Sequence, residues 1–203
     1  MKWNRRSLLA GSTLAAAAAT TGLAPLGAWA QGKKDTLTLA LVLEPPGLDP
    51  TASAASSIGE VVLYNVFETL TKINPDGSVS PLLAESWEVS PDLKTYTFRL
   101  RRGVAFHNGA PCNAAAVKFS FERAGGDKST NKDKRTFANL RVQVVDEHTV
   151  VLINQDIEPD LLFLLGQATA IIVEPKSAAT NATKPVGTGP YRLDPWAKGA
   201  ALT

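Results

Sequence analysis

The side chains of this sequence that could carry out catalytic or metal chemistry are few and far apart. Its only histidines are His107 and His148, and Cys112 is its only cysteine. No histidines and cysteines have the spacing of a metal site, and no Gly-x-Ser-x-Gly turn presents a nucleophilic serine. The stretch Gly187 to Gly189 lacks the later glycine and the lysine of phosphate-binding loops. We therefore predict no metal ion, no cofactor and no catalytic residue, while carboxylate pairs formed by folding stay open.

Cys112 admits two interpretations, a free reactive thiol or a small residue packed before a helix. A single thiol cannot form an internal disulfide. No basic residue or histidine adjoins it in the sequence to lower its pKa. We favour the packing role.

The elements that would position any site are short strands and helices in irregular order. Periodicity predicts strands over 36–43, 86–89, 95–101, 140–145, 149–153 and 170–173, and a further one after Tyr191. Helices are predicted from Ser56 or Ser57 to about 70, from a cap at Asn113 to about 123, and over 159–165. Turns are expected over 74–77 and 90–93, and a mobile loop over 125–134. This mixture indicates an α/β or α+β domain.

The strand over 95–101 alternates apolar and polar side chains. Tyr96, Phe98 and Leu100 face one way, which is typical of a half-buried hairpin strand. On the preceding strand, Trp87 lies between Ser86 and Glu88, and we expect it to be largely buried.

The first thirty residues have the layout of a cleavable signal peptide. Lys2, Arg5 and Arg6 precede an apolar run over 8–26, and the small residues Ala28 and Ala30 bracket a cleavage position. A membrane-spanning anchor is the alternative, but glycines and a proline interrupt a run made mostly of alanine and threonine. The paired arginines resemble a twin-arginine export motif, although the general secretory route stays open.

The mature chain, residues 31–203, is close to electrically neutral. Without residues 1–30, 18 of the 21 Lys and Arg residues remain against 19 Asp and Glu, a net charge of −1. The charges are interspersed, and no basic block is left to bind nucleic acid. The length suits one domain with a sizeable core.

Six segments, in order, resemble one protein family. The stretches Leu83–Ser90 and Tyr96–Gly109 resemble the signature of family 5 extracellular solute-binding proteins, the peptide- and nickel-binding components of ABC importers. Four further segments are similar: Leu48–Pro50, Phe67–Leu70, Val117–Arg123 and Pro185–Tyr191. Two departures from the pattern are Asn108, where Asp is usual, and Cys112–Ala115, where Thr-Ala-Glu-Asp is common.

The resemblance implies a type II periplasmic binding protein fold with two lobes that close on a ligand. On that pattern residues 31–203 form an incomplete amino-terminal lobe, since family members are usually more than twice as long. It also implies a ligand-facing segment, residues 51–56, with the binding residues Thr51, Ser53, Ala54, Ala55 and Ser56. The alternative is a polar linker with a helix cap. Gly187 and Gly189 would bend the chain toward the hinge or form a plain turn.

The function implied by the resemblance is binding, without catalysis, of a peptide-like solute in the periplasm. The partner would be the membrane permease of an ABC importer, and we expect a monomer. Two alternatives stay open: a truncated product that binds nothing, and an exported enzyme with an unrecognised site. Peptides, opines, nickel chelates and glycosides are all bound within the family, so the solute is not specified.

Overall fold

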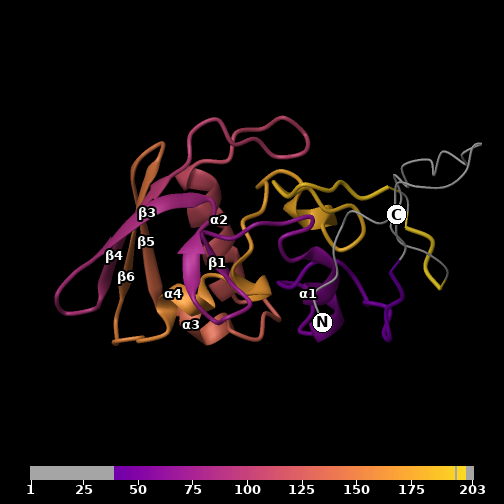
Figure 1. Cartoon of the computed structure of the whole chain (residues 1–203), viewed down its shortest axis with the longest axis horizontal. Coiled ribbons are helices and arrows are strands. Elements are labelled where there is room, and N and C mark those ends of the chain that lie inside the picture. The colour runs from indigo at the N-terminus through magenta and orange to yellow at the C-terminus, as the bar shows by residue number, and fades with distance from the viewer. Residues whose placement is uncertain (1–38, 195, 200–203) are drawn as a thin grey trace, which may run out of the picture. The chain divides into compact units, whose positions relative to one another are not determined.

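The main sheet joins two β-hairpins into four antiparallel strands (Figure 1). The structure, a computed structural model, describes residues 39–194 and 196–199, and its strand order is β3-β4-β6-β5. The strands are β3 Ala84–Val89, β4 Thr95–Leu100, β5 Leu140–Asp146 and β6 Thr149–Asn154. Both predicted hairpins are confirmed, and β4 pairs with β6 to unite them.

One face of this sheet packs against helix α2, Ala114–Gly125. Tyr96, Phe98 and Leu100 of β4 are buried on that face, as their alternation predicts. The predicted cap is also confirmed, because the Asn113 side chain accepts a hydrogen bond from the Ala116 N–H at 3.2 Å. Each large apolar side chain buried here contributes about 1.5–3 kcal/mol.

Trp87 faces the same core from the edge strand β3. It pairs with Phe98 in the register, and the two ring centroids are 6.1 Å apart. Its neighbours Ser86 and Glu88 are exposed. The structure leaves Trp87 half-buried rather than largely buried as predicted, because its side chain faces the core but lies on the edge strand.

A smaller hairpin and several short helices complete the structure. Strands β1 Thr71–Ile73 and β2 Val79–Pro81 flank the predicted turn, in which Gly77 has a φ of 82°. The helices are α1 Ser56–Val62, α3 Lys134–Ala138 and α4 Leu161–Leu164, with 3-10 turns η1 Ala168–Ala170 and η2 Ala178–Thr180.

A second core joins residues from the two ends of the described chain. Its buried members are Leu48, Ile58, Val62, Val66, Phe67, Ile171, Val173 and Ala178. Helix α1 ends at Val62, well before the predicted end near residue 70. The helix is shorter because the chain leaves the helical region at Leu63, whose ψ is 126°, and turns at Tyr64, whose φ is 60°.

Several predicted strands are wrong in the described region. Residues 39–43 and 171–173 pair in no strand, and neither do residues 191–194, although Ala197 lies in an isolated β-bridge and the rest of the strand expected after Tyr191 falls partly outside the described residues. A strand needs a neighbour for its N–H and C=O groups. Residues 171–173 bond instead to a loop and a helix. The Ile172 N–H donates to the Glu68 carbonyl, and the Val173 N–H donates to the Ser120 hydroxyl.

The predicted helix over 159–165 is shorter than expected, and the predicted loop over 125–134 is attached to its surroundings. Pro159 lies in a turn before α4. In the loop, Asn131 is buried and its Nδ2 donates to the Thr169 carbonyl at 2.8 Å. The predicted signal peptide, residues 1–30, lies outside the described residues. Among the described residues, no helix has the length and apolar character to cross a bilayer.

Candidate ligand-facing segment

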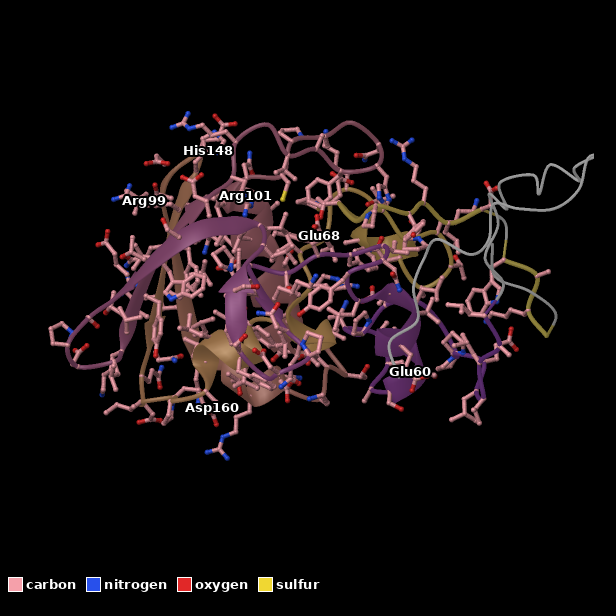
Figure 2. The ribbon with its side chains drawn as sticks, viewed as in Figure 1. Glu60, Glu68, Arg99, Arg101, His148 and Asp160 are labelled. Carbon is pink, nitrogen blue, oxygen red and sulfur yellow. The ribbon has the colours of Figure 1, made fainter. Side chains whose placement is uncertain are left out.

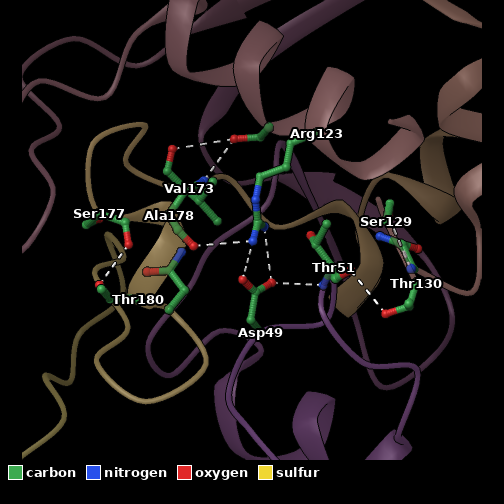
Figure 3. A network of polar contacts seen from close by, with 12 residues as sticks. Asp49, Thr51, Arg123, Ser129, Thr130, Val173, Ser177, Ala178 and Thr180 are labelled. Atoms are coloured by element: carbon green, nitrogen blue, oxygen red, sulfur yellow. Dashed lines mark hydrogen bonds and ion pairs between the residues drawn. The ribbon is translucent and has the colours of Figure 1, made fainter. Parts of the chain in front are cut away.

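A buried ion pair lies immediately before the predicted ligand-facing segment. Asp49 Oδ2 is 2.5 Å from Arg123 Nη2, and Asp49 Oδ1 is 3.2 Å from Nη1 (Figure 3). The carboxylate side chain is 1% exposed and the guanidinium side chain 23%. Such two-pronged, charge-assisted contacts are among the strongest that side chains make, and they fix orientation as well as distance.

The same carboxylate shapes the chain that follows it. Asp49 Oδ1 accepts a hydrogen bond from the Thr51 N–H at 2.9 Å, and the Asp49 carbonyl accepts one from Ala52 N–H at 3.0 Å. This is a local side-chain turn of the kind that aspartate favours. Through Asp49, Arg123 on α2 therefore helps to position the start of residues 51–56.

Thr51 is anchored inside the domain. It is 7% exposed, and its carbonyl accepts hydrogen bonds from the N–H of Thr130 at 3.0 Å and from the Thr130 hydroxyl at 3.3 Å. Of the five predicted binding residues, Thr51 is the one that the structure buries. Its contacts hold the loop 126–133 against the start of the segment.

The other four residues are open to solvent to different degrees. Ala54 and Ser56 are exposed, while Ser53 and Ala55 are half-buried. Helix α1 begins at Ser56, and its N-cap Ala55 has no side chain able to cap it. The expectation that Ser56 or Ser57 caps this helix is therefore wrong. The segment presents small side chains and hydroxyls. Its backbone is held at the start by the contacts of Asp49 and Thr51, and at the end by the Ile58 N–H, which donates to the Ala55 carbonyl at 3.2 Å.

Helix α2 ties this region to the later part of the chain. Arg123 Nη2 also donates to the Ala178 carbonyl of η2 at 3.3 Å (Figure 3). The Ser120 hydroxyl accepts from the Val173 N–H at 2.9 Å and donates to the Ala116 carbonyl. Segments more than 100 residues apart thus share one supporting helix.

Gly187 and Gly189 allow the chain to pass directly over the backbone at Asn65 and Val66. A Cβ on either glycine would overlap carbonyl oxygens there, and the Gly189 N–H donates to the Val66 carbonyl at 3.0 Å. His107 holds the other side of this turn, since its N–H donates to the Gly187 carbonyl and its Nε2 lies 2.8 Å from the Gly189 carbonyl. His107 therefore has a structural role here.

The other reactive groups do not converge. In Figure 2, Arg99, Arg101 and His148 lie at one end of the sheet and Asp160 at the other. Within the described ranges, no three His, Cys, Asp or Glu residues are grouped so that they could hold a metal ion. Burial, with a smaller contribution from the Glu68 carboxylate, raises the pKa of the Cys112 thiol to about 12. This supports the packing role for that residue.

One feature of the site could not be read from the sequence. Asp49 and Arg123 both lie in segments that resemble the family, yet they are 74 positions apart. Nothing in their spacing indicates that they pair. The sequence marks each residue separately, Asp49 as an aspartate before Pro50 and Arg123 as a basic residue in the last turn of a helix, but it does not indicate their contact.

Comparison with known proteins identifies relatives for most of the chain. The model of the bacterial extracellular solute-binding proteins, family 5 Middle, matches residues 78–203. The glutathione-binding protein GsiB of Salmonella choleraesuis (strain SC-B67) is 36% identical over 154 residues, which are 73% of this chain and 30% of that protein.

Solved structures show the same relationship. AgaA from A.tumefacien R10, in complex with agropinic acid, has a TM-score of 0.72 and 32% identity, covering 78% of this chain and 33% of that one. DppA from Helicobacter pylori, in complex with the peptide STSA, has a TM-score of 0.67 and 26% identity, covering 77% and 36%. The chain therefore spans about a third of the length of these proteins, and its mixed helix-and-sheet fold is that of part of one lobe of a periplasmic binding protein.

Proposed function

The chain belongs to family 5 of the bacterial extracellular solute-binding proteins, and on this basis we propose that it supplies the amino-terminal lobe of a binder of peptide-like solutes. The solute would be delivered to the membrane permease of an ABC importer. Relatives bind glutathione, agropinic acid and the peptide STSA according to their names and structures, which supports a small peptide-like solute.

The observation that carries the proposal is that residues 53–56 follow a part of the chain that is firmly held in place. A buried ion pair and the buried Thr51 hold the segment at its start, while Ala54 and Ser56 are exposed. A binding surface needs such rigidity, because a flexible segment would lose conformational entropy on binding. Small side chains let a peptide-like solute approach the backbone, and the hydroxyls of Ser53 and Ser56 offer hydrogen bonds to it.

Residues 1–30 are proposed to export the protein to the periplasm, where family 5 proteins work. Binding without catalysis accords with the family, whose members are binding proteins. We propose that the protein acts as a monomer and needs no cofactor.

The test is a tryptophan introduced into the ligand-facing segment of the complete gene product. Ala54→Trp places a bulky ring on the surface that the solute would occupy. We expect its affinity for glutathione or short peptides, measured by calorimetry, to fall about tenfold or more. The matched control is Ala115→Trp, since Ala115 is also exposed but lies on α2 outside the segment.

Equal affinities for the Ala54→Trp variant and the unchanged protein would show that the segment is not part of the binding surface. Absence of binding to every peptide tested, in a folded protein, would refute the assignment of solute class.

A further inference from the structure

A cavity separate from the ligand-facing segment opens where β6 ends. It has a volume of about 310 Å³ and lies between helix α3 and the loop that leads to α4. Asp160, at the start of α4, marks this end of the sheet in Figure 2. The polar residues that line the cavity are Arg135, Thr136, Asn139, Asn154, Asp156 and Glu158.

Asn154 is the buried polar group of this cavity. Its residue is 5% exposed, and its side-chain Nδ2 has no hydrogen-bond partner in the part of the chain that the structure describes. The backbone holds it in place, because Asn154 N–H donates to the Lys94 carbonyl at 2.8 Å. This Nδ2 has almost no accessible surface, so a ligand in the cavity would meet the Asn154 Oδ1 instead.

The lining carries charges of both signs. Arg135 contributes a cation from α3, while Asp156 and Glu158 contribute carboxylates from the loop. Burial raises the pKa of the Tyr96 hydroxyl, and the charge of the nearby Glu158 carboxylate raises it further. Lys94 holds the loop by donating from its Nζ to the Gln155 carbonyl at 2.9 Å. One cation and two anions disfavour a purely anionic ligand.

We propose that this cavity binds a free α-amino acid as its zwitterion. The carboxylate would accept from the Arg135 guanidinium, and the ammonium group would donate to Asp156, Glu158 and the Asn154 Oδ1. The volume lies at the lower end of the range for ligand pockets, which run from about 300 to 1,000 Å³. It therefore suits one amino acid better than an extended peptide. This site is independent of the proposed solute-binding surface.

The test uses the common L-amino acids, each titrated singly into the purified 203-residue chain and followed by thermal shift and calorimetry. We expect at least one to bind with a dissociation constant of about 1 mM or lower. Its N-acetylated and its carboxamide forms should bind about tenfold more weakly, because each lacks one of the two charges. Absence of binding by every amino acid up to about 10 mM would overturn the proposal.

Two variants locate the binding. Asn154→Leu removes the side-chain amide while keeping the side chain's size, and Arg135→Gln removes the cation. Each should weaken amino-acid binding about tenfold or more. Arg141→Gln, on an exposed arginine of β5, should leave the affinity unchanged. Ala54→Trp should also leave it unchanged, which separates this site from the peptide surface. Binding that survives both cavity variants, or that Ala54→Trp abolishes, would overturn the assignment.

Discussion

Asp49 and Arg123 have side chains that are 1% and 23% exposed, whereas those of the pair Arg99 and Glu88 are 57% and 77% exposed. This difference decides what each pair contributes. An exposed pair is screened by water and is worth about 0–1 kcal/mol. Removing one partner of a buried pair leaves the other charge without compensation, which costs several times more.

We therefore expect Asp49→Asn to lower the free energy of unfolding by about 3 kcal/mol. The change keeps the shape of the side chain and removes only its charge opposite Arg123. Glu88→Gln is the matched control and should cost about 1 kcal/mol or less. Urea unfolding monitored by circular dichroism measures both. Equal, small losses would show that the Asp49 carboxylate does not hold the chain in place.

Cys112 gives a second expectation for a single residue. Its pKa in the folded protein is raised to about 12, so folding favours the protonated thiol. That contribution to stability is fully present below the thiol's ordinary pKa of about 8.5 and is lost as the pH rises toward 12. At pH about 8, iodoacetamide should leave the folded protein unmodified and alkylate it in urea. Mass spectrometry reads out the reaction, and Cys112→Ala should remove the part of the alkaline stability loss that the thiol causes. Fast labelling of the folded chain would contradict this account.

The elements of this protein fall into two groups, those held by local pairing and those held by distant backbone. The hairpins β3-β4 and β5-β6 pair neighbours in the chain. Helix α1 instead packs in the second core against residues near the other end of the described chain, and the chain at Gly187 passes closely over the Val66 backbone. The stability of elements of the second kind is sensitive to a single added atom where two distant backbone segments pass close to each other.

Gly187→Ala is expected to lower the free energy of unfolding by about 3 kcal/mol, because the added Cβ would overlap the Val66 carbonyl. Gly47→Ala is the control, since a Cβ there meets the Ala182 carbonyl at an ordinary contact distance of 3.4 Å. It should cost about 1 kcal/mol or less. Thermal unfolding compares the two variants, and an unchanged melting temperature for Gly187→Ala would show that the close crossing is absent in solution.

On the scale of the whole molecule, the chain corresponds to about a third of its relatives. GsiB is matched over 30% of its length and AgaA over 33%. A two-lobe binder closes around its ligand, so contacts from one lobe are a fraction of the total.

Residues 31–203 by themselves are therefore expected to bind glutathione or short peptides weakly or not at all. Losing about 4 kcal/mol of contact free energy weakens binding roughly a thousandfold. Calorimetric titration is the measurement, with GsiB and glutathione as the positive control. Micromolar binding by residues 31–203 would show that one lobe suffices.

The proposed export signal gives a second expectation at this scale. Cleavage after Ala30 should leave Gln31 as the first residue of the periplasmic protein, and mass spectrometry can identify it. If export follows the twin-arginine route, replacing Arg5 and Arg6 by lysine should block it. Undiminished export of that variant would point to the general secretory route, and an intact Met1 in the periplasmic fraction would exclude cleavage.

The sequence alone was sufficient for the local elements and the family. Alternation in β4, the cap at Asn113 and the turn before Gly77 depend on neighbouring residues, and the structure confirms all three. The family could be identified from the sequence because each of its motifs is also a short run of neighbouring residues.

Only the tertiary structure decided features that depend on distant partners. Residues 39–43 and 171–173 have the composition of strands, yet a strand forms only where another offers its backbone. Helix α1 ends early at the chain turn near Tyr64. The pairing of Asp49 with Arg123 joins residues 74 positions apart, and spacing along a chain does not encode such a contact because folding alone brings the two charges together.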